Sequence, residues 1–167
     1  SGVNDASGII FSVIGLLYSL LLAFIVVAVW EDYEQTNIDI ANEAAVASDI
    51  YSYSHMLTPD NRMQVNTLLV DYLKSVVNDE WPAMALDNKS EKTTEVYKKL
   101  RDKIFSMVSN DSINQKVREQ LILETVKLKD ARITRLAELH SQLPRVVWFV
   151  MLLGSFICIF SSSSISE

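Results

Sequence analysis

The sequence is poor in the residues that break helices or cross-link a chain. It contains 4 glycines, 3 prolines and 1 cysteine, and no glycine occurs between Gly15 and Gly154. Because tight β-hairpin turns depend on glycine, a glycine-free stretch of this length excludes most hairpin-based folds and predicts an all-α protein. The lone cysteine, Cys158, excludes an intrachain disulfide and leaves the redox compartment open.

Charged residues are missing from two segments near the ends of the chain, residues 9–30 and 146–160. Between them, Glu31–Arg145 holds all 15 basic residues and 19 of the 21 acidic residues, which gives this region a net charge of −4. A mildly acidic region without a cluster of basic residues argues against nucleic-acid binding and against a polybasic anchor for anionic lipid.

The first uncharged segment has the length of a transmembrane helix. As an α-helix it would rise about 33 Å, which matches the hydrocarbon core of a bilayer. A signal peptide is the alternative, but no basic region precedes the segment, and Glu31 and Asp32 stand where a cleavage site would follow. We therefore predict an integral membrane protein with transmembrane helices at residues 8–30 and 146–160 and an extramembrane domain at residues 31–145. A run of serines follows the short second segment, so we expect this segment to be truncated and the chain to be a piece of a longer protein.

Helix signals divide the extramembrane domain into about four helices. No glycine or proline lies between Trp30 and Leu57, so we expect the first transmembrane helix to continue into the domain, as one helix from about Gly8 to Leu57. Residue types that begin helices mark the starts of the other three helices, at Thr58-Pro59, Ser90 and Ser112.

The second helix of the domain should end at Trp81-Pro82. Proline has no amide hydrogen, and its ring collides with the carbonyl four residues earlier in an α-helix. We expect the ring of Trp81 to be largely buried against the helix bundle, which makes Trp81 and Pro82 a structural element.

The two signs of charge are separated along the domain. Residues 31–60 contain seven acidic residues and no basic ones, whereas residues 116–145 contain seven basic and four acidic residues. If both apolar segments cross one bilayer, the first and last helices of the domain are antiparallel neighbours, with Glu43 near Arg132 and Arg135. Two solvated faces that merely differ in charge are the alternative. Because an exposed ion pair contributes about 0–1 kcal/mol, the separation indicates orientation more than stability.

A stripe of small residues follows one face of the first apolar segment. Such a face lets the backbone of another helix approach closely in lipid. Two interpretations stay open, namely helix–helix packing and the lining of a pore. The residues of the stripe are Gly8, Ser12, Gly15, Ser19 and Ala23, with a shorter version at Gly154 and Cys158 in the second segment.

Aromatic residues stand where the two apolar segments meet the domain. Trp30 and Tyr33 follow the first segment, and Arg145 and Trp148 lie at the start of the second. Tryptophan, tyrosine and arginine side chains at these places are typical of a membrane–water interface. Packing of the aromatic rings in the core of the domain is the alternative.

The sequence offers little for catalysis. His55 and His140 are the only histidines, and neither has a cysteine or histidine three or four residues away. No phosphate-binding glycine loop, nucleophile elbow or metal-ligand spacing occurs. No ionisable carboxylate, lysine, arginine or histidine lies inside either apolar segment, which argues against a proton relay or an ion pump. We therefore expect a non-enzymatic protein without catalytic, cofactor-binding or metal-binding residues.

Several short motifs of the chain occur together in one known family. They are Asn4-Asp5, Gly15–Phe24 (GLLYSLLLAF), Asp79–Met84 (DEWPAM), Asp130-Ala131-Arg132 with Arg135-Leu136, and Leu143-Pro144 with Trp148. By these motifs the chain resembles the bestrophin-like family of bacterial membrane proteins of unknown function, over nearly all of residues 4–160. Members usually carry another apolar helix before the Asn-Asp pair, joined by a basic loop, and a further helix at the end, and this sequence includes neither. If those flanks are basic, the resemblance implies a domain that faces away from the cytoplasm.

The resemblance implies a multi-pass protein of the cell membrane, and the family name suggests an ion-channel-like assembly. Two helices cannot enclose a water path, so a pore needs several copies of the chain. The alternative is a membrane-tethered sensor or protein-interaction module. The partners that we expect are the lipid bilayer and further copies of the chain, and no nucleic acid, while a small-molecule or ion ligand stays open.

Overall fold

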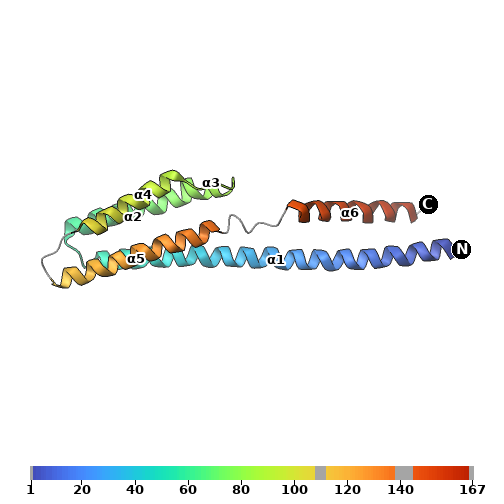
Figure 1. The fold of residues 1–167 in the computed structure, drawn as a ribbon, viewed down its shortest axis with the longest axis horizontal. Helices are drawn as coiled ribbons and strands as arrows, with labels where there is room; N and C mark the ends of the chain where they lie inside the picture. The colour runs from blue at the N-terminus through green and yellow to red at the C-terminus, as the bar shows by residue number, and fades with distance from the viewer. Residues whose placement is uncertain (1, 108–111, 138–144, 166–167) are drawn as a thin grey trace. The chain divides into compact units, whose positions relative to one another are not determined.

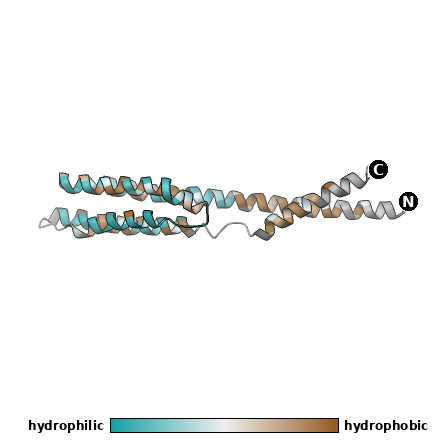
Figure 2. Cartoon of the chain, turned by 90° about the horizontal axis from the view of Figure 1, so that it is seen from above, coloured by the Kyte–Doolittle hydropathy of each residue, from teal (hydrophilic) through white to brown (hydrophobic). Residues whose placement is uncertain are grey.

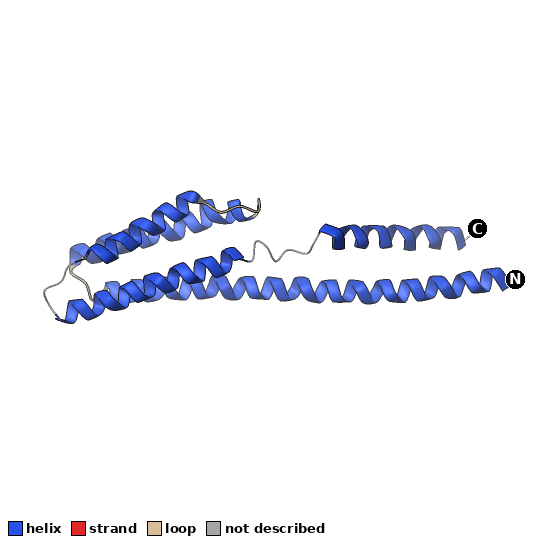
Figure 3. Cartoon of the chain, viewed as in Figure 1, coloured by secondary structure: helices blue, strands red, loops and turns tan. Residues whose placement is uncertain are grey.

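The computed structural model describes residues 2–107, 112–137 and 145–165, all but a few of them helical (Figure 1). The elements are α1 (Gly2–Ser54), α2 (Pro59–Ser75), the π-helix η1 (Val76–Glu80), α3 (Trp81–Met84), α4 (Glu91–Ser106), α5 (Ser112–Ala137) and α6 (Arg145–Ile165). Figure 3 shows helices and connecting loops and no strand among these residues, which confirms the predicted all-α class.

The chain forms two compact units. Unit 1 consists of Ser1–Glu34 and Gln142–Glu167, and unit 2 consists of Gln35–Ser141. Helix α1 contributes residues to both units, and it is one unbroken helix to Ser54, which confirms the predicted continuity past Trp30 but ends three residues before the predicted Leu57. The membrane boundaries at residues 8–30 and 146–160 stay predictions.

Unit 1 contains the apolar helices. Among the described residues, one helix is long and apolar enough to cross a membrane, and this is α1 from Ser12 onward. Helix α6 contains a shorter apolar stretch, Val147–Phe156. Figure 2 shows hydrophobic residues along both helices of unit 1, whereas unit 2 is mixed. The structure thus supplies one clear candidate for the two predicted spans.

Unit 2 is a helical bundle around a core that all of its long helices share. Helix α2 begins with Thr58 at its N-cap position and Pro59 in its first turn, although the Thr58 side chain makes no capping bond. Helix α4 is capped by Ser90, whose Oγ accepts a hydrogen bond from the Thr93 amide over 3.1 Å. The buried apolar residues are Ala47, Ile50, Val65, Leu69, Tyr72, Val76, Tyr97, Leu100, Ile104, Met107, Val117, Leu121 and Leu128.

The helix that begins at Pro59 passes through Pro82 instead of ending there. The π-helix η1 follows α2 directly, and α3 continues to Met84 with Pro82 in its first turn. The Trp81 amide bonds to the carbonyl of Val76, five residues earlier. In a regular α-helix each amide bonds to the carbonyl four residues earlier, and a proline ring collides with that carbonyl. The wider turn before Pro82 loosens this arrangement. The prediction that the helix ends at Trp81-Pro82 was therefore wrong by about one turn.

Candidate functional site

Four charged side chains meet inside unit 2. Arg135 on α5 bonds from Nε to Oε2 of Glu43 on α1, and from Nη2 to Oε2 of Glu80 on η1 over 2.6 Å. Arg132, one turn earlier on α5, donates from Nε to both Glu80 oxygens at 3.1 Å. All four residues are buried, and Glu80 is 0% exposed. Residues Glu43, Glu80, Arg132 and Arg135 are called the ion-pair network below.

Hydrogen bonds from neighbouring helices complete the ion-pair network. The Tyr72 hydroxyl donates to Oε1 of Glu43, and Nη2 of Arg132 donates to Oγ1 of Thr94 over 2.9 Å. Nη1 of Arg135 lies 2.9 Å from the thioether sulfur of Met84. The network therefore links α1, α2, η1, α3, α4 and α5 at one level of unit 2.

Burial controls the protonation of the groups around the network. Burial raises the pKa of Tyr72 far above its usual value, and the adjacent carboxylate of Glu43 raises it further, so Tyr72 stays a hydrogen-bond donor. Burial alone would lower the pKa of Arg135, but its hydrogen bonds and charge interactions with Glu43 and Glu80 raise it overall. Two carboxylates and two guanidinium groups balance each other in charge. Removing one member would leave an uncompensated buried charge, at a cost of about 3–5 kcal/mol.

The sequence predicted part of this network. The expected proximity of Glu43 and Arg135 is found as a direct ion pair. The expectation of exposed pairs was wrong, because these side chains lie in the interior. Glu80 was missed as a partner, although it stands in the Glu-Trp-Pro motif and both arginines stand in the later Asp-Ala-Arg segment. The signal that could have found it is the pairing of an acidic motif with two arginines three residues apart, which share one helix face.

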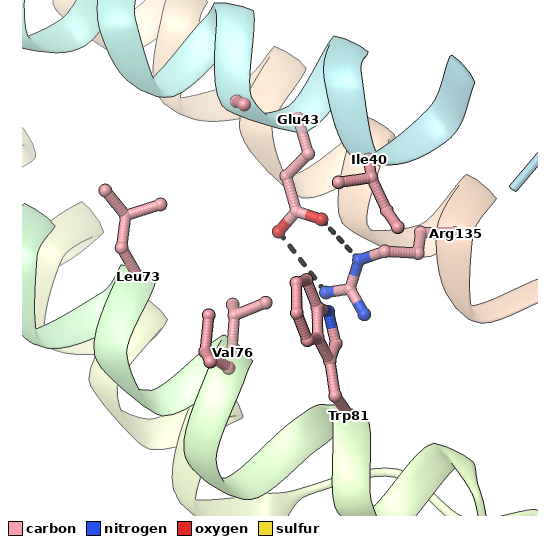
Figure 4. Close-up of a pocket in the computed structure, with 8 residues that line it drawn as sticks. Ile40, Glu43, Leu73, Val76, Trp81 and Arg135 are labelled. Atoms are coloured by element: carbon pink, nitrogen blue, oxygen red, sulfur yellow. Dashed lines mark hydrogen bonds and ion pairs between the residues drawn. The ribbon is translucent and has the colours of Figure 1, made fainter. Parts of the chain in front are cut away.

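An apolar pocket of about 210 Å³ lies beside the network in unit 2. Figure 4 shows Trp81 pointing towards the Glu43–Arg135 pair, with Leu73 and Val76 on one side and Ile40 on the other. The charged groups at the pocket are already paired with each other. The pocket therefore suits an apolar group better than an ion. Its lining residues are Ile40, Glu43, Ala44, Leu73, Val76, Val77, Trp81 and Arg135.

Trp81 is not a buried core residue. Its side chain is 41% exposed, which contradicts the prediction of a largely buried ring. The reason lies in the π-helix η1, where Val76 and Glu80 face the interior of unit 2. Trp81 follows directly after η1, at the edge of this interior. Pro82 beside it is exposed. The structural role predicted for the motif belongs to Glu80 more than to Trp81.

In unit 1, the side chain of Tyr18 joins α1 to α6. Its hydroxyl donates to the carbonyl of Met151 over 2.6 Å and lies 2.6 Å from Oγ of Ser155. Gly154 lies directly under the ring, because a Cβ added there would be 2.3 Å from Cε2 of Tyr18. The predicted close approach at Gly154 is thus made by an aromatic ring of α1. The side chain of Cys158 lies outside the described residues.

The small-residue stripe of α1 lies away from this contact. A Cβ added at Gly8 or Gly15 would have no atom within 4 Å, apart from neighbours in the chain and the helix's own backbone. Ser12 and Ser19 bond to the carbonyls of Gly8 and Gly15 in their own helix, at 2.9 and 2.8 Å. Ala23 is exposed. Helix packing through this stripe stays a prediction. The contact between α1 and α6 that the structure describes is made by Tyr18 instead.

The predicted interface residues are exposed where the structure describes them. The rings of Trp30 and Tyr33 lie with their centroids 6.3 Å apart, and more than half of each side chain is exposed, as it is for Trp148. These three aromatic residues are therefore not packed in a core. Arg145 begins α6, but its side chain lies outside the described residues.

The described residues hold no group of three histidine, cysteine, aspartate or glutamate side chains that could bind a metal. His55 packs edge-on against Tyr51 with a centroid distance of 4.8 Å, and His140 lies outside the described residues.

A family model described as the Bestrophin-like domain matches residues 1–164. Among curated proteins and solved structures, none matches the chain.

Proposed function

The chain belongs to the bestrophin-like family, and from this premise we propose that it is a non-enzymatic integral membrane protein that assembles from several copies into an ion-channel-like oligomer. Both α1 and α6 cross the membrane in this proposal, and unit 2 lies outside the bilayer. The partners are the lipid bilayer and further copies of the same chain.

The observation that carries the proposal is the open face of α1. The contact with α6 uses Tyr18 and Gly154, while Gly8 and Gly15 have open space around them. A face of small residues on which the structure describes no atom close to an added Cβ at Gly8 or Gly15 favours close approach of a second α1 in lipid. A water path needs such additional copies, because one pair of helices cannot surround it.

Two measurements on the full-length protein test this function. Light scattering after size exclusion in detergent should give a defined oligomer, and reconstitution into planar bilayers should give discrete conductance steps. A strict monomer without conductance would contradict the proposal.

The apolar pocket favours a second function, a membrane-tethered sensor or protein-interaction module. Trp81 stands half exposed at the edge of the pocket, and aromatic residues of this kind are enriched at binding sites. A monomeric protein whose Trp81 fluorescence changes with an apolar ligand or partner would support this function over the channel.

The orientation of unit 2 is part of the proposal. We place unit 2 on the extracytoplasmic side of the cell membrane, which is the orientation that basic flanks, as the family resemblance implies them, would give. A membrane-impermeant reagent added to intact cells should modify exposed lysines of unit 2, such as Lys98. Modification only after the cells are opened would place unit 2 in the cytoplasm.

A further inference from the structure

Helix α1 carries its charges on the inside of unit 2 and none on the outside between residues 35 and 48. The only charged residues of this stretch are Asp39 and Glu43, and both are buried. A helix at the surface of a protein normally shows the reverse arrangement, with its charged side chains towards water. The exposed residues of the stretch are Gln35, Asn37, Ile38, Ala41, Asn42, Ala44, Ala45 and Ser48.

Helix α4 of the same unit shows the usual arrangement. Its exterior is dominated by charged side chains, and the uncharged exterior of α1 is therefore a local property of α1. Because the centres of protein interfaces are depleted of charged residues, the exterior of α1 has the composition of a surface that a partner covers. The exposed charged residues of α4 are Glu91, Lys92, Glu95, Lys98, Lys99 and Asp102.

Apolar side chains from α2, η1 and α3 extend the uncharged surface of α1. Val70, Leu73, Val77 and Trp81 are between 38% and 48% exposed, and they follow one another at intervals of three or four residues, which places them on one side of this helical stretch. Leu73, Val77 and Trp81 line the same pocket as Ala44 of α1, so the helices form one surface. We call it the α1–α2 face, and its residues are Ile38, Ala41, Ala44, Ala45, Ser48, Val70, Leu73, Val77 and Trp81.

The lack of charge indicates what covers the α1–α2 face. A basic or an acidic partner would need opposite charges on this face, and the face has none. Region 31–145 as a whole has a net charge of −4, so copies of the chain repel one another over most of their surface. At the α1–α2 face two copies can meet without opposing like charges, because the same neutral patch is present on both.

The side chains of α1 in this face also suit a close contact between two helices. Ala41, Ala45 and Ser48 are small, and the distance between two packed helices depends on the size of the side chains between them. The larger side chains stand beside them, with Trp81 at the edge of the pocket (Figure 4). An exposed apolar patch of this extent is typical of a protein–protein contact.

We propose that the α1–α2 face is a contact between two copies of the chain, in which α1 of one copy packs against α1 of the other. Apolar side chains of the second copy then cover the pocket, and Trp81, which is half exposed in one copy, becomes buried between two. The contact rests on the assembly of several copies in the proposed function. It lies entirely in unit 2 and does not require a pore.

Cross-linking of the full chain in liposomes tests the contact. Cys158 is replaced with serine, so that each variant carries one cysteine. A symmetric contact brings residues near its centre close to their own equivalents, so Ala45→Cys should form a covalent dimer with a short bismaleimide. Lys98→Cys is the matched control, because it is an exposed position on the charged exterior of α4 and should form little dimer. Equal cross-linking at residues 45 and 98 would overturn the contact, since random collision would then account for it.

Two half-exposed valines test whether the face itself makes the contact. Val77 is 48% exposed within the α1–α2 face, and Val126 is 43% exposed on α5, outside it. In the chain with Ala45→Cys, Val77→Glu should slow cross-linking by at least about tenfold, because it places an unpaired carboxylate in the contact. Val126→Glu should leave the rate unchanged. Equal rates in the two variants would overturn the proposal. If circular dichroism shows that Val77→Glu has lost helix, Ser48→Glu on the exterior of α1 takes its place.

Light scattering and conductance of the parent chain separate this inference from the proposed function. An oligomeric parent without cross-linking at residue 45 would overturn the contact and leave the proposed assembly standing. Cross-linking at residue 45 in a parent that shows no conductance would support the contact and contradict the channel. A monomeric parent would overturn both, and quenching of a dye at residue 45 by spin-labelled lipid would then show that the bilayer covers the face.

Discussion

The guanidinium of Arg135 donates a hydrogen bond from Nη2 to Oε2 of Glu80 over 2.6 Å, at a place where both side chains are removed from solvent. Glu80 also forms an ion pair with Arg132, so one carboxylate neutralises part of the positive charge of two guanidinium groups. The pairing joins the π-turn to α5, which are separated by more than fifty residues of sequence. The geometry of this part of unit 2 therefore depends on a charge balance as well as on apolar packing.

Replacing Glu80 with glutamine should destabilise unit 2 strongly. Glu80→Gln keeps the shape of the side chain but leaves Arg132 and Arg135 with too little negative charge in the interior, at a cost of about 3–5 kcal/mol. Denaturant unfolding in detergent, followed by circular dichroism, measures the loss. Asp79→Asn is the control, since Asp79 pairs with the exposed Lys92 and should lose only about 0–1 kcal/mol. Equal losses in the two variants would contradict a special role of the buried network.

Tyr72 should make the stability of unit 2 fall in alkali. Its pKa is raised in the folded state, so above pH 10 the unfolded chain releases the tyrosine proton while the folded chain keeps it. Unfolding then becomes more favourable as the pH rises, by up to about 1.4 kcal/mol for each pH unit. Tyr72→Phe should therefore show a shallower decline of unfolding free energy between pH 10 and 11 than the parent. Parallel curves for the two proteins would contradict this.

Trp81 should contribute less to stability than a core tryptophan. Because its ring is 41% exposed, Trp81→Ala should cost about 1–2 kcal/mol, below the 3–5 kcal/mol typical of a buried tryptophan. Thermal unfolding of Trp81→Ala is compared with that of Tyr72→Ala, and Tyr72→Ala should lose clearly more stability. A larger loss for Trp81→Ala would mean that the ring is covered in the assembled protein.

The sequence predicted the elements of this fold better than their contacts. The lack of glycine predicted the all-α class, and the serine at position 90 predicted the start of α4. The burial of Glu80 could not be predicted in the same way, because a lone glutamate in a helix is normally exposed and becomes buried only when distant arginines reach it. The π-helix η1 could not be predicted either, because hydrogen bonds to the carbonyl five residues earlier leave no distinctive sequence periodicity in so short a stretch. Local signals are present in the sequence, whereas the network depends on residues far apart in it.

Gly154 should not tolerate even a methyl group. The Cβ of Gly154→Ala would lie 2.3 Å from the ring of Tyr18, so either this ring would have to turn aside or α1 and α6 would have to move apart, and both changes disturb the bonds of Tyr18 to Met151 and Ser155. Overpacking of this kind costs about 1–3 kcal/mol. Gly15→Ala is the matched control, since its Cβ would meet open space. Thermal unfolding in detergent should separate the two variants, and identical midpoints would contradict a close contact at Gly154.

The small-residue stripe of α1 should be the contact between copies of the chain. Leucine at Gly15 or Ser19 would push a partner backbone away, since the stripe works by allowing close approach. Size exclusion with light scattering should show that Gly15→Leu and Ser19→Leu dissociate the oligomer, while Leu21→Phe, at an exposed apolar position of the same helix, leaves it intact. If all three variants behave like the parent, the stripe faces lipid and the contact lies elsewhere. If the parent is a monomer and the first two variants only lower its stability, the tethered-module function gains support over the channel.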